Sequence, residues 1–160
     1  MTTELFIKMA LDNWNSYIDR TDKLFADLSD DQLMREVSPG RNRGIYLLGH
    51  LACVHDRMLP LLEFEAQRYP HLDDPFHELP DRAVETLPPI AELRDCWHAV
   101  NEALAGHFAK LKAPDWFERH TAVSPEDFRQ QPHRNKLNVI LNRTGHLATH
   151  YGQLLFLKQK

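Results

Sequence analysis

The chain of 160 residues has the length of one ordinary domain, and 42% of its residues are hydrophobic, which is enough for a buried core and excludes a disordered chain. Lys and Arg number 19 and Asp and Glu number 23, so the net charge is −4. A chain with this charge has no general attraction for phosphate groups, so we expect no nucleic-acid partner. Histidine is unusually frequent, with ten histidines against six glycines. This excess is the first indication of chemistry.

The small number of cysteines and the lack of long apolar runs indicate the cellular compartment of the protein. Cys53 and Cys96 are too few for a disulfide framework and are typical of a reducing environment. The N-terminal segment has no basic region followed by an apolar run, so we expect no signal peptide. No run of eighteen apolar residues occurs, so we expect no membrane-spanning segment. These features together predict a cytoplasmic protein.

Prolines divide the chain into segments, because proline breaks the interior of a helix. Four long segments between prolines remain: 1–38, 40–59, 90–113 and 133–160. The two regions 60–89 and 114–132 carry a proline every few residues and predict long irregular connections. Strand-like alternation of useful length is missing. The sequence therefore predicts an all-α fold, a four-helix bundle that forms a single domain over 1–160.

Apolar residues recur at helical spacing of three and four in each long segment. In chain order these stripes run from Ile7 to Leu28, Leu47 to Leu61, Ile90 to Leu111 and Val139 to Leu157. Two short helices are predicted between them. Ser29-Asp30-Asp31-Gln32 is a capping-box pattern, and Ser124-Pro125-Glu126-Asp127 combines an N-cap residue, a first-turn proline and two acids.

The histidines fall into two groups, those in the predicted connections and those on the predicted helices. Solvated loop residues are expected in the broken connections, at His71, His77, His120 and His133. We expect His98 to be exposed and His107, alone on an apolar stripe, to be a core histidine. His146 and His150 differ because they are four residues apart and project from one helix face. That geometry lets one helix offer two imidazoles to a metal ion.

A third histidine from another helix would complete a site with open positions, which is typical of catalytic metal centres. The tetrapeptide Gly145-His146-Leu147-Ala148 recurs as Gly49-His50-Leu51-Ala52, which indicates two similar environments. His50 and His55 both lie on the buried side of the second helix, and periodicity does not choose between them. Gly145 and Gly152 bracket the histidine pair. An interior helical glycine costs about 1 kcal/mol relative to Ala, so we expect a packing or site reason for both.

Two stretches resemble the DinB/YfiT-like superfamily of helical-bundle metalloproteins. They are Leu47-Leu48-Gly49-His50-Leu51-Ala52 with the following Val54-His55-Asp56, and Arg143 to Gln153, which contains the family's His-x-x-x-His followed by Gly-Gln. The resemblance covers nearly the whole chain. It implies a metal triad of His50, His146 and His150, a four-helix bundle and a homodimer. The family includes thiol-dependent S-transferases and an isomerase that uses a low-molecular-weight thiol, so the resemblance also implies a thiol co-substrate.

Three nitrogen ligands do not select one metal, so we expect one divalent ion, zinc or nickel first and iron or manganese as alternatives. Such an ion lowers the pKa of a bound thiol or water. Hydrolysis also needs a general base, and the nearest carboxylates in sequence, Asp56 and Glu63, are out of step with His50. The sequence therefore favours a metal-dependent, thiol-dependent S-transferase with a small-molecule substrate. The alternatives are a metal-dependent hydrolase and a non-catalytic, dimeric helical binding module.

Four residues are candidates for substrate binding. Arg143 lies one turn before His146 on the same face and is suited to an anionic group, with a salt bridge at the end of the bundle as the alternative. Asn13, Tyr17 and Tyr46 are polar residues on inward stripes and are candidates for lining a pocket, with boundary positions as the alternative. Cys53 is expected to be a small buried hydrophobe rather than a nucleophile. The sequence assigns no catalytic residue.

Overall fold

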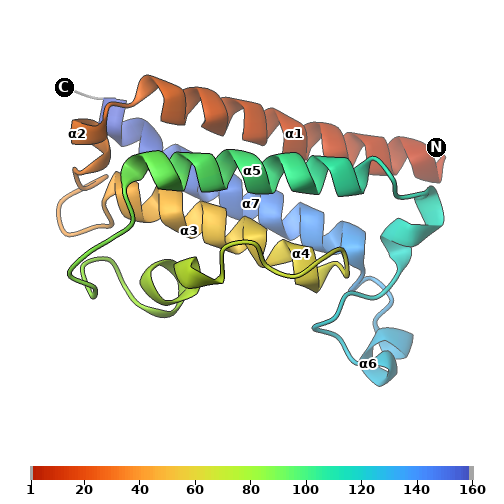
Figure 1. Ribbon diagram of the computed structural model, residues 1–160. Coiled ribbons are helices and arrows are strands. Elements are labelled where there is room, and N and C mark those ends of the chain that lie inside the picture. The colour runs from red at the N-terminus through yellow and green to blue at the C-terminus, as the bar shows by residue number, and fades with distance from the viewer. Residues whose placement is uncertain (1, 159–160) are drawn as a thin grey trace.

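The four predicted long helices lie side by side in the structure, a computed structural model that describes residues 2–158 (Figure 1). They are α1 (Thr3–Asp27), α3 (Gly44–Asp56), α5 (Ile90–Phe108) and α7 (Lys136–Leu154). Residues 2–158 contain seven α-helices and no β-strand, which confirms the all-α fold. No helix in this part of the chain has both the length and the apolar character needed to span a membrane.

Short helical elements occupy the connections. They are α2 (Asp30–Leu33), α4 (Met58–Leu61), α6 (Pro125–Gln130), the 3-10 turns η1 (Pro70–Leu72), η3 (Ala113–Phe117) and η4 (Leu155–Lys158), and one π-helical turn, η2 (Asp74–Glu78). The two predicted short helices are present as α2 and α6. Ser29 and Gln32 form the expected capping box, and the Ser124 side chain caps α6.

The second long helix is shorter than its apolar stripe predicts. The stripe continues to Leu61, but α3 ends at Asp56 and a separate turn, α4, follows after Arg57. Pro60 explains the break, because a proline ring clashes with the carbonyl four residues earlier, which here belongs to Asp56. The stripe itself is not interrupted in space, since Met58 and Leu59 are fully buried.

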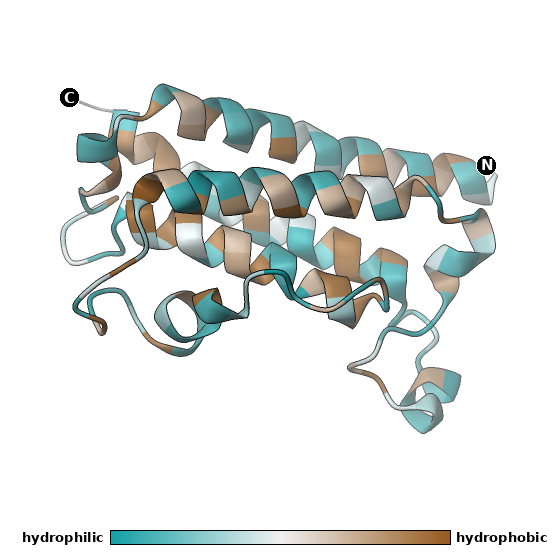
Figure 2. Ribbon diagram, in the orientation of Figure 1, coloured by the Kyte–Doolittle hydropathy of each residue, from teal (hydrophilic) through white to brown (hydrophobic). Residues whose placement is uncertain are grey.

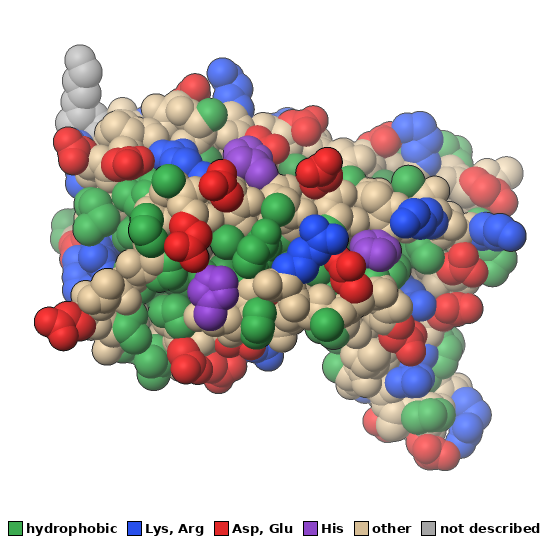
Figure 3. All heavy atoms as spheres, in the orientation of Figure 1, with side chains coloured by type: hydrophobic (Ala, Val, Ile, Leu, Met, Phe, Trp, Pro, Cys, Tyr) green, Lys and Arg blue, Asp and Glu red, His purple; other side chains and the backbone are tan. Residues whose placement is uncertain are grey.

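The core lies between the long helices. α1 packs chiefly on α7, and α3 packs chiefly on α5. α3 is the most enclosed helix, because every one of its residues except His50 is buried. α1 buries one face only and carries hydrophilic residues on its outer side (Figure 2). Charged side chains of both signs are interspersed over the face seen in Figure 3, which shows no basic stripe.

The long connection between α4 and α5 is tied to α3 at several points. Arg43 and Asp81 form an ion pair of 2.6 Å that is largely buried. The Tyr46 hydroxyl donates to the Leu79 carbonyl at 2.9 Å. Asp56 accepts the backbone N–H groups of residues 68 and 69 at 2.9 and 2.8 Å. These bonds satisfy backbone and charged groups of the connection and hold η2 against the middle of α3.

Candidate metal centre

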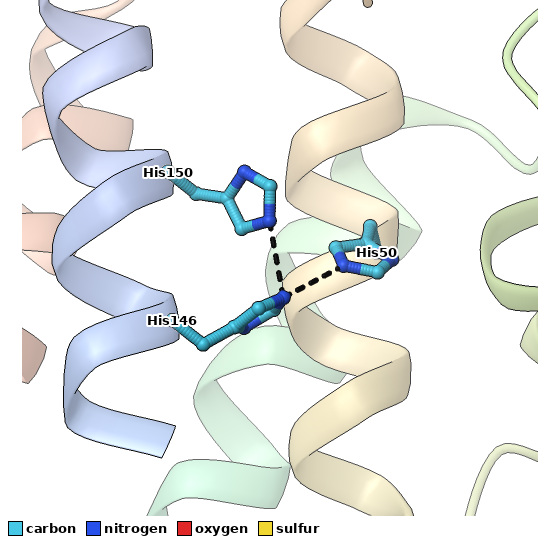
Figure 4. Close-up of side chains that lie close together, drawn as sticks. All are labelled: His50, His146 and His150. Carbon is cyan, nitrogen blue, oxygen red and sulfur yellow. Dashed lines mark hydrogen bonds between the residues drawn. The ribbon is translucent and has the colours of Figure 1, made fainter. Parts of the chain in front are cut away.

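Three histidines from two helices meet in the middle of the fold (Figure 4). His146 and His150 project from α7 toward α3, and His50 projects from α3 toward them. The Nε2 atom of His146 lies 3.1 Å from the Nε2 atom of His50 and 3.1 Å from that of His150. One ligand atom from each ring lies within 4.8 Å of the others. The expected juxtaposition of these three side chains is therefore present.

The spacing of these nitrogens suits a small divalent ion. Metal–nitrogen bonds of about 2.0–2.1 Å at ligand angles between about 90° and 109° separate two nitrogens by roughly 2.8–3.4 Å. The two separations of 3.1 Å from His146 fall inside that range. Two of the three nitrogen pairs are thus already spaced for a metal ion, and the third pair lies within 4.8 Å.

Hydrogen bonds on the far side of two rings set their orientation. His50 donates from Nδ1 to the backbone carbonyl of Phe76 in η2 at 2.7 Å. His150 donates from Nδ1 to the Gln153 side-chain oxygen at 2.8 Å. Because both partners are acceptors, the protons sit on Nδ1 and the Nε2 lone pairs face the cluster. Partners of this kind orient metal-ligating histidines and raise their basicity.

The cluster keeps its imidazoles neutral. Burial lowers the pKa of His50 and of His150, and burial with the neighbouring histidines lowers that of His146 to about 3. Neutral imidazole is the form that binds metal. The Nδ1 atom of His146 is buried and has no hydrogen-bond partner within residues 2–158. A single proton on its Nε2 atom serves only one of the two lone pairs opposite. A cation among the three rings would accept the Nε2 lone pairs of all three histidines, so the residues fit a divalent ion.

The close approach of η2 to α3 requires a glycine at position 49. A Cβ atom at Gly49 would lie 2.4 Å from Cε1 of Phe76, so only glycine lets η2 approach α3 closely enough for the His50 bond. A Cβ atom at Gly145 or at Gly152 would meet nothing within 4 Å. Of the two predicted reasons for glycine at these positions, packing is wrong, and a role in the site stays a prediction. The repeated tetrapeptide accordingly does not mark two equivalent environments.

His55, the alternative to His50, lies elsewhere in the core. Its ring sits between the indoles of Trp14 and Trp97, with centroids 4.9 and 5.0 Å away. Its Nδ1 atom donates to the Asn101 side-chain oxygen at 2.7 Å. Complete burial lowers its pKa to about 4. His50, and not His55, therefore faces the pair on α7.

The remaining candidates occupy different positions relative to the cluster. Tyr46 is buried and stacks on His50 with ring centroids 6.1 Å apart. Tyr17 is half-buried and contacts Tyr151 edge-on at 6.1 Å. Asn13 is exposed on α1 and makes no side-chain hydrogen bond within residues 2–158, so the structure does not bring it to the histidines.

Arg143 is half-buried, and the alternative role, a salt bridge at the end of the bundle, is not formed with any carboxylate among residues 2–158. It lines a pocket near the cluster. A larger pocket, of about 380 Å³, lies between the start of α1 and the end of α5, and none of the three histidines lines it.

The other histidines mostly follow expectation. His71, His77, His98 and His133 are exposed, whereas His120 is half-buried. His107 is half-buried rather than in the core and stacks on Phe64 at 4.6 Å. Sequence reasoning missed Phe76 and Gln153 as partners of the cluster. Gln153 belongs to the quoted motif of the fourth helix, and the one sequence signal for Phe76 is the glycine at position 49.

Comparisons with known proteins assign the family. A search of curated proteins finds no significant match to the chain. The family model described as the DinB superfamily matches residues 15–154, a span that includes the second half of α1 and the whole of α3, α5 and α7. With a match over most of its length and a histidine cluster that fits a metal ion, the chain belongs to the DinB superfamily.

Proposed function

We propose that the protein binds one divalent metal ion, zinc or nickel first, through His50, His146 and His150, and acts as a thiol-dependent S-transferase. The sulfur of a low-molecular-weight thiol loses its proton and forms a new C–S bond with a small-molecule substrate, from which a leaving group departs. The observation that carries the proposal is the convergence of three neutral imidazoles whose Nε2 atoms lie 3.1 Å apart in two pairs. Bound there, the ion would lower the pKa of a thiol and supply a nucleophile at neutral pH. Three protein ligands leave room for thiol and substrate.

S-transfer is favoured over hydrolysis because neither Asp56 nor Glu63, the carboxylates nearest to His50 in sequence, is available as a general base. Both side-chain oxygens of Asp56 accept backbone N–H groups, and the side chain is fully buried. Glu63 is exposed and forms an ion pair with Lys136 at 3.6 Å. A water nucleophile would need a base within hydrogen-bond reach. A thiol activated by a metal ion has less need of one.

The thiol must come from outside the chain. Cys53 is buried and its Sγ atom donates to Asp73 at 3.2 Å, and burial raises the pKa of this thiol well above its usual range. Burial also raises the pKa of Cys96 to about 11. The thiolate is the nucleophile in sulfur chemistry, and neither cysteine forms it at neutral pH.

Metal content is the first test. Plasma mass spectrometry of untagged protein should find about one divalent ion per chain, lost in the His146→Ala/His150→Ala variant. The His98→Ala/His133→Ala variant, which removes two exposed histidines, is the matched control and should keep the ion. Absence of metal from the wild type, even after incubation with zinc and nickel, would leave the non-catalytic binding module as the better description.

Activity is the second test. A set of low-molecular-weight thiols is incubated with a chromogenic aryl chloride, so that the sulfur forms the new C–S bond and chloride leaves. The rate should depend on the metal and fall to background in His146→Ala/His150→Ala. A metal-loaded protein that ignores every thiol but cleaves a chromogenic ester would instead support the hydrolase.

The homodimer is part of the same proposal. Three large apolar side chains, Leu5, Phe6 and Met9, are exposed on the first turns of α1. Contiguous exposed apolar groups are typical of association surfaces. Association through α1 leaves the histidine cluster free, because its ligands come from α3 and α7.

A further inference from the structure

A pocket of about 310 Å³ is lined by two arginines, Arg57 and Arg143. None of the three cluster histidines lines it, but two of its lining residues are close along the chain to residues of the cluster. Arg143 precedes His146 by three residues on α7, which is about 4.5 Å along the helix axis. His77 also lines the pocket, and it follows Phe76, whose carbonyl accepts the His50 hydrogen bond. A molecule in this pocket therefore lies beside the candidate metal ligands.

Arg143 carries a charge that nothing in the described chain balances. It is half-buried, yet its guanidinium makes no hydrogen bond or ion pair within residues 2–158. Burial lowers its pKa, and the nearby Arg57 lowers it further. Partly desolvated charges in proteins are normally paired, because leaving one unpaired is costly. The guanidinium of Arg143 is thus available to an anion from outside.

Unlike Arg143, Arg57 is already ion-paired, and this limits the negative charge of the anion that the pocket can bind. Arg57 pairs with Asp73 at 3.2 Å and with Glu78 at 3.5 Å, so its charge is already offset. The pocket therefore offers one unpaired positive charge, which suits a singly charged group better than a dianion. The planar fork of a guanidinium matches a carboxylate through two parallel hydrogen bonds. Pro60 and Leu61 give the same pocket an apolar side.

We propose that Arg143 binds the carboxylate of a small-molecule acid in this pocket, with the carbon skeleton of the acid against Pro60 and Leu61. Arg143 is then a residue that determines substrate specificity. The role of this acid as the substrate rests on the proposed function, whereas its binding does not.

Binding is measured in the metal-free His146→Ala/His150→Ala protein, so that no carboxylate is held by a metal ion. Benzoate and benzamide are nearly identical in shape and differ in charge, and each is titrated while chemical shifts are followed. Benzoate should bind at least tenfold more tightly than benzamide, because charge-assisted hydrogen bonds contribute roughly a tenfold to hundredfold gain. Arg143→Gln in this background should weaken benzoate binding to the benzamide level. Arg129→Gln, which removes an exposed arginine paired with Glu126, is the control and should change nothing.

Several results would overturn the inference. Equal binding of benzoate and benzamide would show that charge is not recognised, and unchanged affinity in Arg143→Gln would show that another group binds the acid. Inorganic phosphate binding more tightly than benzoate would refute the carboxylate assignment. Arg143→Lys keeps the charge without the fork and should give intermediate affinity, and circular dichroism confirms that each variant folds.

Failure of this inference is separable from failure of the metal proposal. A wild-type protein that binds metal, and whose metal-free variant does not bind benzoate, refutes only the carboxylate site. A chain that binds benzoate through Arg143 but never binds metal refutes only the metal-dependent reaction.

Discussion

Gly49→Ala should destabilise the protein and weaken metal binding together. The added Cβ atom would lie 2.4–2.5 Å from three ring atoms of Phe76, and the ring is fully buried and has no solvent to move into. Inserting a methyl group into a packed core costs about 1–3 kcal/mol. For a chain of this size, that corresponds to a fall in Tm of about 2–12 °C. Displacement of η2 also removes the acceptor of His50, and loss of such a partner lowers metal affinity about 10–100-fold.

Thermal and urea unfolding of metal-free protein measures the first effect, and competition with a metal-binding dye measures the second. Gly145→Ala is the matched control, because Gly145 also directly precedes a histidine of the cluster. A Cβ atom at this position would meet no other atom within 4 Å. It should leave stability unchanged or raise it by up to about 1 kcal/mol. Phe76→Leu combined with Gly49→Ala should recover part of the lost stability. Equal stability of Gly49→Ala and wild type would refute the argument from close approach.

Three further outcomes are expected. The folded pKa of His55 is about 4 and its unfolded value about 6.5, so the unfolded chain binds more protons between these values. The stability that His55 contributes is complete above pH 6.5 and is lost as the pH falls to 4, and urea titrations should show a shallower pH dependence in His55→Gln. Cys53 and Cys96 should resist alkylation at pH 7.5 until the protein is unfolded, and rapid labelling of the native protein would contradict their burial. Light scattering should give twice the chain mass of 18.7 kDa, and a single-chain mass at micromolar concentration would refute the homodimer.

Much of the fold is predictable from the sequence because proline and apolar periodicity act locally. The four long helices lie inside the proline-free segments, and the capping box at Ser29 is formed as its pattern predicts. The end of α3 was misplaced because Met58 and Leu61 keep the apolar spacing after Pro60 has broken the helix. Periodicity reports which residues are buried and does not report whether the helix that carries them is continuous.

The candidate site was less predictable because it depends on which elements face each other. His50 and His55 are on a helix that is apolar on nearly all sides, so the apolar pattern of the sequence does not distinguish them. The two histidines differ in the groups around their rings. The His50 ring faces α7, and the His55 ring lies between Trp14 and Trp97. The partner of His50 comes from a connection 26 residues further along the chain, and no local pattern announces it.

The group that holds His50 is a main-chain oxygen, which every amino acid has. No substitution at position 76 can delete that acceptor, so an alanine scan of the chain would pass over it. What supplies the acceptor is the route of the connection between α4 and α5, which also carries the bonds to Arg43 and Tyr46. An engineer who replaced this connection with a short linker would retain all three histidines and all four long helices. The ring of His50 would then be free to rotate, and the cost would appear as lost metal affinity in a protein that still folds.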